Sequence, residues 1–324
     1  MEASWPYVRD LALRSEDLGY DLSLIAELNL NDIKGVQAPS LDAWSTAAAL
    51  AAVTRRLELM VAVRPTFHLP ALLAKQAANI DRISGGRLSL NVVSSWWEQE
   101  ARMYGVQFDS HEERYARTSE WLDVLDGVWS RDGFSYSGKY YQVDGTALEP
   151  KPQRQPRPTL YAGGESEAAK NLIAQKCDAY VMHGDPPEKV AEKVRDMSER
   201  RGKLGLPPMI YGVAGYAFVR GTRAEVDRER ERITNVQAHA AGFANYQQWL
   251  KGTQLEQRMS IEEYSVSNRG LRSGLMGTPE DVQTQVDRFE KVGVDLLLLQ
   301  FSPQLEEMER FSEDVIRPFQ STPA

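Results

Sequence analysis

The residues of this chain that are best suited to chemistry begin where an apolar segment stops. Segment 87–93 contains Asn91 and runs directly into two serines and two tryptophans at 94–97. An amide, two hydroxyls and two indoles would suit a flat heteroaromatic ring, which needs a few directed hydrogen bonds and an apolar face to lie on. The alternative is that Trp96 and Trp97 begin a surface helix and pack on it, because large aromatic side chains are mostly core.

A second stretch has the composition of a phosphate site. In TLYAGGESEAAKNLI (159–173) an apolar run ends at Gly163 and Gly164, Ser166 follows, and a helical pattern begins. Backbone N–H groups at the start of a helix, together with a serine hydroxyl, can hold a phosphate at the mouth of a barrel. Glycine is also common at strand-to-helix turns that bind no ligand. This stretch alone is therefore compatible with a phosphate site and with an ordinary turn.

An arginine and a tyrosine form a third candidate. Arg114 and Tyr115 open the long helical pattern at 112–129, where the pair could clamp a phosphate or a ring carbonyl. On a solvated helix face the same residues would form ordinary i,i+4 pairs. Polar residues also stand where other apolar runs end: Glu27, Arg64, His183 and Ser302.

The composition excludes several classes of protein. A formal net charge of -8 argues against a nucleic-acid or anionic-membrane surface, since a phosphate-binding face needs a basic field. The single cysteine, Cys177, cannot form an internal disulfide, and the four histidines have no metal-ligand spacing, so we predict no metal site. The chain shows neither a signal peptide nor an apolar run of about 20 residues, which predicts a cytoplasmic protein.

These candidates must be positioned by elements that alternate along the chain. Helical patterns at 6–21, 41–54 and 69–84 are interleaved with short apolar runs, and further runs follow. The strand-like runs lie at 22–27, 57–63, 87–93, 159–163, 178–184, 209–219 and 295–301. Strands that are apolar along their whole length and alternate with helices indicate a parallel sheet covered on its outer face. Because no G-x-G-x-x-G follows an early strand, a (β/α)8 TIM barrel is favoured over a dinucleotide-binding fold.

The predicted barrel departs from regularity in three places. Only seven strand-like runs are found and the chain opens directly on a helix, so the first strand of the barrel is predicted to be missing from this chain. An insertion at 132–157 contains alternating aromatics at 134–145 that predict a β-hairpin. The polar stretch at about 236–278 is predicted to form a lid, and the whole of 1–324 a single domain.

Longer strings connect these motifs to one family. The segments IDRISGGRLSLNVVSSWWEQEARMYG (80–105), DSHEERYARTSEWLDVLDGVW (109–129) and LMGTPEDV (275–282) resemble, in order, the bacterial luciferase-like flavin monooxygenases. The resemblance is closest to the group that contains the alkanesulfonate, dimethyl sulfone and pyrimidine-ring-opening monooxygenases. It implies a luciferase-like TIM barrel that takes reduced FMN from a separate NAD(P)H-dependent flavin reductase and inserts one oxygen atom of O2 into its substrate. It also implies a homodimer or homotetramer.

The resemblance also implies roles for individual residues. It places flavin contacts at Asn91, Glu100, Arg114, Tyr115 and Ser166, with Gly164 beside the phosphate and Glu27 as a further flavin position. The substrate pocket is expected to include Arg64, Trp96, Trp97 and Ser302. The two tryptophans would then form an apolar wall that keeps water from the reduced ring.

Departures from the family pattern bear on the substrate. Where alkanesulfonate monooxygenases carry an Arg, a His and a Tyr, this chain has Ala214, Tyr216 and Ser302. A site without those groups is less well equipped for a sulfonate anion, although Arg64 or an arginine of the lid could compensate. The pyrimidine enzyme has a Thr where Ala62 stands here. A small organosulfur compound, a neutral sulfone more readily than a sulfonate, is therefore predicted.

Three residues are candidates for catalysis, and two other functions remain open. Tyr216 and His68 are the expected proton donors, and Arg272, with Arg269, lies in the 268–277 part of the lid, where it would meet the flavin phosphate or the substrate on closure. The first alternative is an oxidoreductase on the same barrel that transfers hydride with deazaflavin F420. The second is a non-catalytic flavin-binding protein.

Overall fold

The structure is a computed structural model that describes residues 3–32, 34–235, 250, 260 and 271–320. Its centre is one seven-stranded sheet in which every neighbouring pair of strands is parallel. The strands, in sheet order, are β1 (Leu22–Ile25), β2 (Glu58–Val63), β3 (Leu88–Val92), β6 (Thr159–Ala162), β7 (Ala179–His183), β8 (Ile210–Tyr216) and β11 (Leu296–Gln300). The seven strand-like runs of the sequence are thereby confirmed, with ends that differ by at most three residues.

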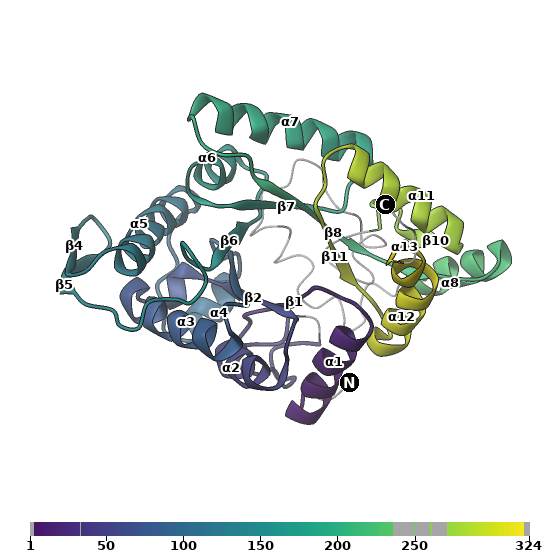
Figure 1. Ribbon diagram of the computed structural model, residues 1–324, viewed down its shortest axis with the longest axis horizontal. Helices are drawn as coiled ribbons and strands as arrows, with labels where there is room; N and C mark the ends of the chain where they lie inside the picture. Colours follow the sequence, from purple (N-terminus) through teal and green to yellow (C-terminus); the bar gives the residue numbers. More distant parts are fainter. Residues whose placement is uncertain (1–2, 33, 236–249, 251–259, 261–270, 321–324) are drawn as a thin grey trace.

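Helices surround the curved sheet (Figure 1). They are α1 (Trp5–Asp17), α2 (Ala43–Val53), α3 (Pro70–Ser84), α5 (His111–Ser130), α6 (Glu167–Lys176), α7 (Pro187–Lys203), α11 (Pro279–Lys291) and α12 (Gln304–Phe311). Further helical segments join or extend them: η1 (Pro65–Phe67), α4 (Glu98–Met103), α8 (Arg223–Thr234), η3 (Ser312–Ile316) and α13 (Arg317–Gln320). The alternation of strand and helix is that of the predicted luciferase-like TIM barrel.

Alternate residues of each strand belong to two different cores. Leu59, Val61 and Val63 of β2 are buried in the large cluster between sheet and helices. Met60, by contrast, packs with Tyr161 inside the barrel. Because successive side chains of a strand point to opposite faces, each strand must be apolar on both sides, which explains the uninterrupted apolar runs.

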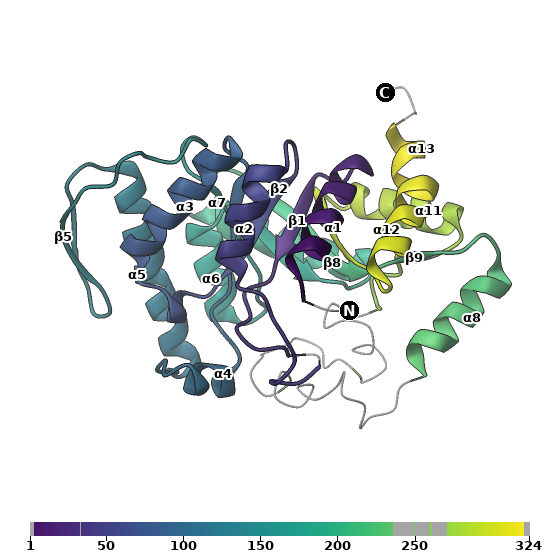
Figure 2. The ribbon, with the colours of Figure 1, turned by 90° about the horizontal axis from the view of Figure 1, so that it is seen from below.

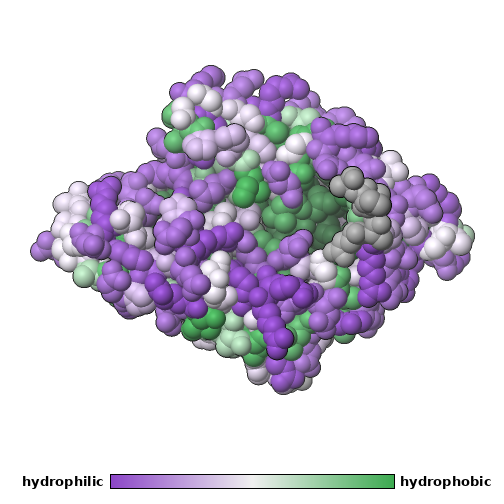
Figure 3. All heavy atoms as spheres, viewed as in Figure 1, coloured by the Kyte–Doolittle hydropathy of each residue, from purple (hydrophilic) through white to green (hydrophobic). Residues whose placement is uncertain are grey.

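The barrel has two edge strands, β1 and β11. Within the part of the chain that the structure describes, no strand lies between them, and the chain enters α1 at Trp5. Four inward-facing leucines of these edges are only half-buried: Leu22, Leu24, Leu296 and Leu298. Figure 3 shows a hollow lined by apolar residues near the barrel axis.

Two irregular regions flank the barrel. The predicted hairpin is confirmed as β4 (Phe134–Ser137) paired antiparallel with β5 (Gln142–Thr146), and it lies outside α5 (Figure 1). The predicted strand at 209–219 is divided, because after β8 the chain changes its pairing partner from β11 to 275–277. The new pair is β9 (Phe218–Val219) with β10 (Met276–Gly277). Most of the predicted lid, Arg269 included, lies outside the described residues.

The loop after β1 and the short helix α4 lie at the same end of the barrel, opposite to the exposed end of α13 (Figure 2). This is the end at which the parallel strands finish, and it is where a barrel of this kind places its ligand. Among the described helices, none is both long enough and apolar enough to span a membrane.

Candidate functional site

Asn91 lies at the carboxyl end of β3 and faces the barrel interior, level with Tyr161 of β6. It is buried, and its Oδ1 atom has no hydrogen-bond partner among the described residues. Four residues later Ser95 is buried with a φ of 56° and an equally unpartnered Oγ. A buried acceptor without a donor costs about 1–3 kcal/mol. The end of β3 therefore presents polar atoms that a bound ligand could satisfy.

Tyr115 and Ser166 connect α5 to the turn that follows β6. The Tyr115 hydroxyl is hydrogen bonded to Ser166, whose Oγ also accepts a hydrogen bond of 3.2 Å from the Ala169 N–H and so caps α6. Burial raises the pKa of Tyr115, so this phenol keeps its proton at neutral pH. Gly164 is required here, since a Cβ at this position would lie 2.6 Å from that of Ala169. The turn thus gathers a helix N-terminus, a serine and a phenol.

Arg114 connects the same helix to the end of β3. Its Nε donates to the Ser94 carbonyl over 3.1 Å, and its Nη1 donates to the Asp109 carbonyl over 2.8 Å. The guanidinium also lies 4.4 Å from the centre of the Phe108 ring. Since β3 pairs with β6 and Tyr115 bonds to Ser166, the structure places Asn91, Arg114 and Ser166 at one rim. Their functional roles remain predictions.

Arg64 lies between two buried glutamates. Its guanidinium pairs with Glu100 through both terminal nitrogens, and its Nε lies 3.5 Å from Oε2 of Glu27. Glu100 Oε1 also accepts hydrogen bonds from the backbone N–H groups of Asn29 and Leu30, at 2.6 and 3.2 Å. All three charged side chains are almost completely buried. Arg64 and Glu100 therefore hold the loop after β1 in place, and the Arg64 charge is already neutralised.

Glu27 has two further partners, Trp44 and His68, and nothing in the sequence indicated that they contact it. The indole of Trp44 donates to its Oε1 over 2.8 Å, and Nε2 of His68 contacts the same oxygen. Burial, the largest influence, would raise the pKa of Glu27, but His68, Arg64 and the Trp44 hydrogen bond together hold that pKa below its usual value. The Glu27 carboxylate is therefore charged at neutral pH and orients His68.

Trp96 and Trp97 stack on each other with ring centroids 5.5 Å apart and an angle of 5° between planes. Trp97 is fully buried, Trp96 is half-buried, and α4 begins directly after them. The pair directly precedes a short helix, and its role as an apolar wall beside the flavin stays a prediction.

Tyr216 and Ser302, predicted separately, lie together. The Tyr216 hydroxyl donates to the Ser302 carbonyl over 3.1 Å, and Tyr216 is completely buried. Burial is the largest cause that raises the pKa of Tyr216, to about 12. Tyr216 therefore keeps its proton, and in this structure that proton is engaged by the backbone.

A charged cluster that sequence reasoning missed lies behind the Gly163–Ser166 turn. Lys193 of α7 contacts Glu165 and Asp185, and Arg272 lies 3.4 Å from Asp185. A lysine in a helix rich in charged residues gives no sequence signal of burial. Arg272 was itself a predicted residue and Glu165 precedes the predicted Ser166, but Lys193 and Asp185 were not predicted.

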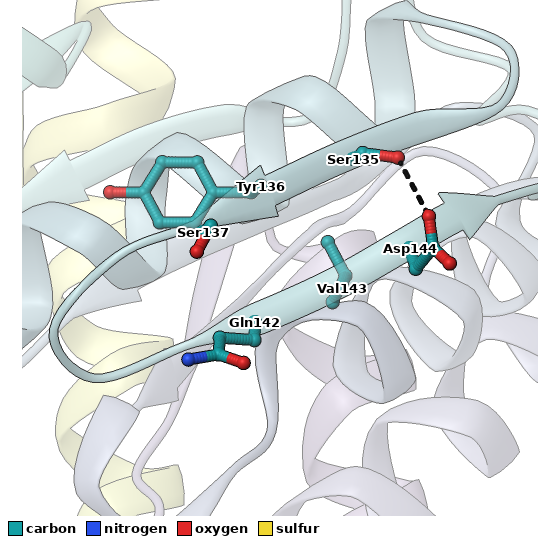
Figure 4. Close-up of a pocket in the computed structure, with 6 residues that line it drawn as sticks. All are labelled: Ser135, Tyr136, Ser137, Gln142, Val143 and Asp144. Atoms are coloured by element: carbon teal, nitrogen blue, oxygen red, sulfur yellow. Dashed lines mark hydrogen bonds between the residues drawn. The ribbon is translucent and has the colours of Figure 1, made fainter.

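Other sites within the described residues are less suited to chemistry. The shallow hollow of about 540 Å³ on the β4–β5 hairpin lies on the outside of the molecule, and in it the Ser135 hydroxyl donates to Asp144 over 3.3 Å (Figure 4). Cys177 is buried, and burial raises the pKa of its thiol to about 12. No group of three or more potential metal ligands was found in the part of the chain that the structure describes.

Comparison with known proteins gives consistent matches. The family model of luciferase-like monooxygenases matches residues 1–296. The FMNH2-dependent dimethylsulfone monooxygenase of Pseudomonas putida is 31% identical over 329 residues, which cover 97% of this chain and 88% of the relative. The enzyme of the same name from Pseudomonas fluorescens (strain Pf0-1) is 31% identical, with 96% and 86% covered. The crystal structure of long-chain alkane monooxygenase (LadA) superimposes with a TM-score of 0.83 at 22% identity, covering 98% of this chain and 84% of that one.

Proposed function

The chain belongs to the luciferase-like monooxygenase family, and from this premise we propose that it uses reduced FMN and O2 to oxygenate a small neutral organosulfur compound. The observation that carries the proposal is the meeting of Asn91, Arg114 and Ser166 at one rim of the barrel. The two dimethylsulfone monooxygenases, similar over nearly the whole chain, support the same substrate class.

The residues at this rim fit FMN. The unpartnered Oδ1 of Asn91 would accept a hydrogen bond from the flavin ring, and Trp97 would contribute to its apolar wall. Ser166, the α6 N-terminus and Tyr115 would hold the phosphate. When bound, reduced flavin supplies the electrons and the reaction with O2, while the protein positions the ring and excludes water.

The charges near the strand ends favour a neutral substrate. Arg64, the arginine that could have paired with a sulfonate, already faces the carboxylates of Glu27 and Glu100. These three groups carry a net charge of −1, which would repel a sulfonate and leaves an uncharged sulfone unaffected.

Two side chains are proposed to handle protons. His68, oriented by Glu27 and partly exposed, can exchange a proton with the solvent and pass it to the site. Tyr216 would hold the developing charge of the substrate by redirecting its hydroxyl from the Ser302 carbonyl. The partner that supplies reduced FMN is a separate flavin reductase, as in two-component enzymes.

The test is an assay of the purified chain with a flavin reductase, NADH, FMN and a panel of sulfones, sulfonates and pyrimidines. We expect dimethyl sulfone, O2 and FMNH2 to yield methanesulfinate, formaldehyde, water and FMN, detected by mass. Oxygen consumption that yields only hydrogen peroxide with every compound would contradict the proposal. Anaerobic hydride transfer to F420 would favour the alternative enzyme.

A further inference from the structure

Lys193 is an unusual residue for an outer barrel helix, because its ammonium is buried. Its side chain is 6% exposed, and Nζ lies 2.6 Å from Oε1 of Glu165 and 2.8 Å from Oδ2 of Asp185. Glu165 precedes Ser166 in the turn after β6, and Asp185 lies two residues beyond β7. One ammonium therefore ties together the loops that follow two neighbouring strands.

Charges of both signs meet in this cluster. Glu165 and Asp185 contribute two negative charges, and Lys193 and Arg272, whose Nη1 is 3.4 Å from Asp185 Oδ1, contribute two positive ones. Burial, the largest influence, would lower the pKa of Lys193, but the charges and hydrogen bonds of Glu165 and Asp185 raise it overall. Lys193 is thus protonated throughout the neutral range. Without it, the cluster beside Ser166 would carry one more negative charge.

A contribution to folding stability does not explain why this charged network is buried. Desolvation offsets most of the attraction within a buried ion pair, and apolar residues of similar volume are often as stabilising. A methionine at position 193 would fill the same space. The network instead fixes the position and the charge of the turn that precedes α6.

We propose that Lys193 is a positioning residue that holds the Gly163–Ser166 turn and neutralises Glu165, and thereby sets the preference of this site for a phosphorylated flavin over the unphosphorylated one. This inference rests on the proposed function, in which Ser166 and the α6 N-terminus receive the phosphate. The mechanism is electrostatic, since one more negative charge next to Ser166 acts on the phosphate, which riboflavin lacks.

The experiment compares the dissociation constants of FMN and riboflavin, both in the reduced form and without oxygen, for the full chain and its variants. Lys193→Met should weaken FMN binding about tenfold, while riboflavin binding changes less than about twofold. Combining Lys193→Met with Glu165→Gln removes one charge of each sign and should restore most of the FMN preference. Lys189→Met is the matched control, because Lys189 is exposed on the same helix and pairs with the exposed Glu192.

Each outcome decides a different point. Equal weakening of FMN and riboflavin by Lys193→Met, or no rescue by the double variant, would show a merely structural role and overturn the inference alone. A parent protein that binds neither flavin, or prefers riboflavin, would end the proposed function as well. If Lys193→Met does not fold, Glu165→Gln is the deciding variant. It removes one negative charge from the cluster, so FMN should bind more tightly than in the parent. An unchanged FMN preference in Glu165→Gln would refute the inference.

Discussion

Among single residues, Asn91 connects stability to ligand binding. Its buried Oδ1 lacks a donor among the described residues, at a cost of about 1–3 kcal/mol. Asn91→Leu should therefore leave the ligand-free protein as stable as the parent or about 1 kcal/mol more stable, and should weaken FMN binding about tenfold. Urea unfolding and flavin titration measure the two effects.

Ser89→Ala is the matched control, since Ser89 carries the other unpartnered oxygen of β3. It should leave FMN binding unchanged, and full FMN affinity in Asn91→Leu would count against the assignment.

Protonation of Glu27 is expected to lower the free energy of unfolding of the protein in acid. Its pKa is held below the usual 4.5, because His68, Arg64 and Trp44 outweigh the opposing effect of burial. A carboxyl whose pKa is depressed on folding contributes stability above its unfolded pKa and loses it as the pH falls through the folded value. The free energy of unfolding should thus be level between about pH 7 and pH 5 and decline below that range.

The corresponding variant is Glu27→Gln. It should cost about 3 kcal/mol at pH 7, since a buried charge network loses one member, and should reduce the decline in acid. Unfolding by urea at pH 7 and pH 4 measures both effects, with the exposed Glu98→Gln as control. An unchanged acid dependence in Glu27→Gln would refute this account.

The sequence could identify residues whose position in a pattern is distinctive. Asn91 ends an apolar strand, and Ser166 follows a glycine pair before a helix, so both could be predicted as site residues. Lys193 could not, because nothing in the charged helix 187–203 distinguishes a buried lysine from a solvated one. Nor could the sequence show that Arg64 is engaged by two glutamates, since Glu27 and Glu100 are far from it along the chain.

Among the elements, the turn between β6 and α6 depends on the absence of a side chain at Gly164. A Cβ at Gly164 would lie 2.6 Å from the Ala169 Cβ, so Gly164→Ala must displace the start of α6. We expect a loss of about 1–3 kcal/mol in the free energy of unfolding and weaker FMN binding. Gly202→Ala is the control, because Gly202 lies in α7 with no atom within 4 Å of the added Cβ. It should be neutral or stabilising by up to about 1 kcal/mol. Equal thermal denaturation of the two variants would refute the assignment.

The elements themselves were predictable where one physical signal dominates. A strand covered on both faces is apolar throughout, and all seven runs of this kind became strands of the sheet. The division of 209–219 into β8 and β9 was not predictable, because it arises when the chain exchanges β11 for a partner some 60 residues away. No residue within 209–219 indicates this change of pairing partner.

For the molecule as a whole, the exposed apolar residues of α2 and α3 bear on the expected homo-oligomer. Leu69, Leu72 and Ile83 are 63%, 70% and 45% exposed, and Val53 at the end of the neighbouring α2 is 37% exposed. Spacings of three and eleven residues place Leu69, Leu72 and Ile83 along one stripe, which can be self-complementary across a two-fold axis. We expect a second copy of the chain to cover it.

Leu72→Glu tests that expectation, because it places a charge at the most exposed position of the stripe. The dissociation constant of the oligomer should rise at least about tenfold, so that light scattering at micromolar concentration reports the mass of one chain. Leu204→Glu, a change of the same kind at an exposed leucine beyond α7, should leave the mass of the assembly unchanged. A parent protein that is already monomeric, or a Leu72→Glu variant with the parent's mass, would show that α3 is not the interface. Because no residue assigned to the flavin site belongs to this stripe, reduced-FMN binding per chain should be the same in the Leu72→Glu monomer as in the parent.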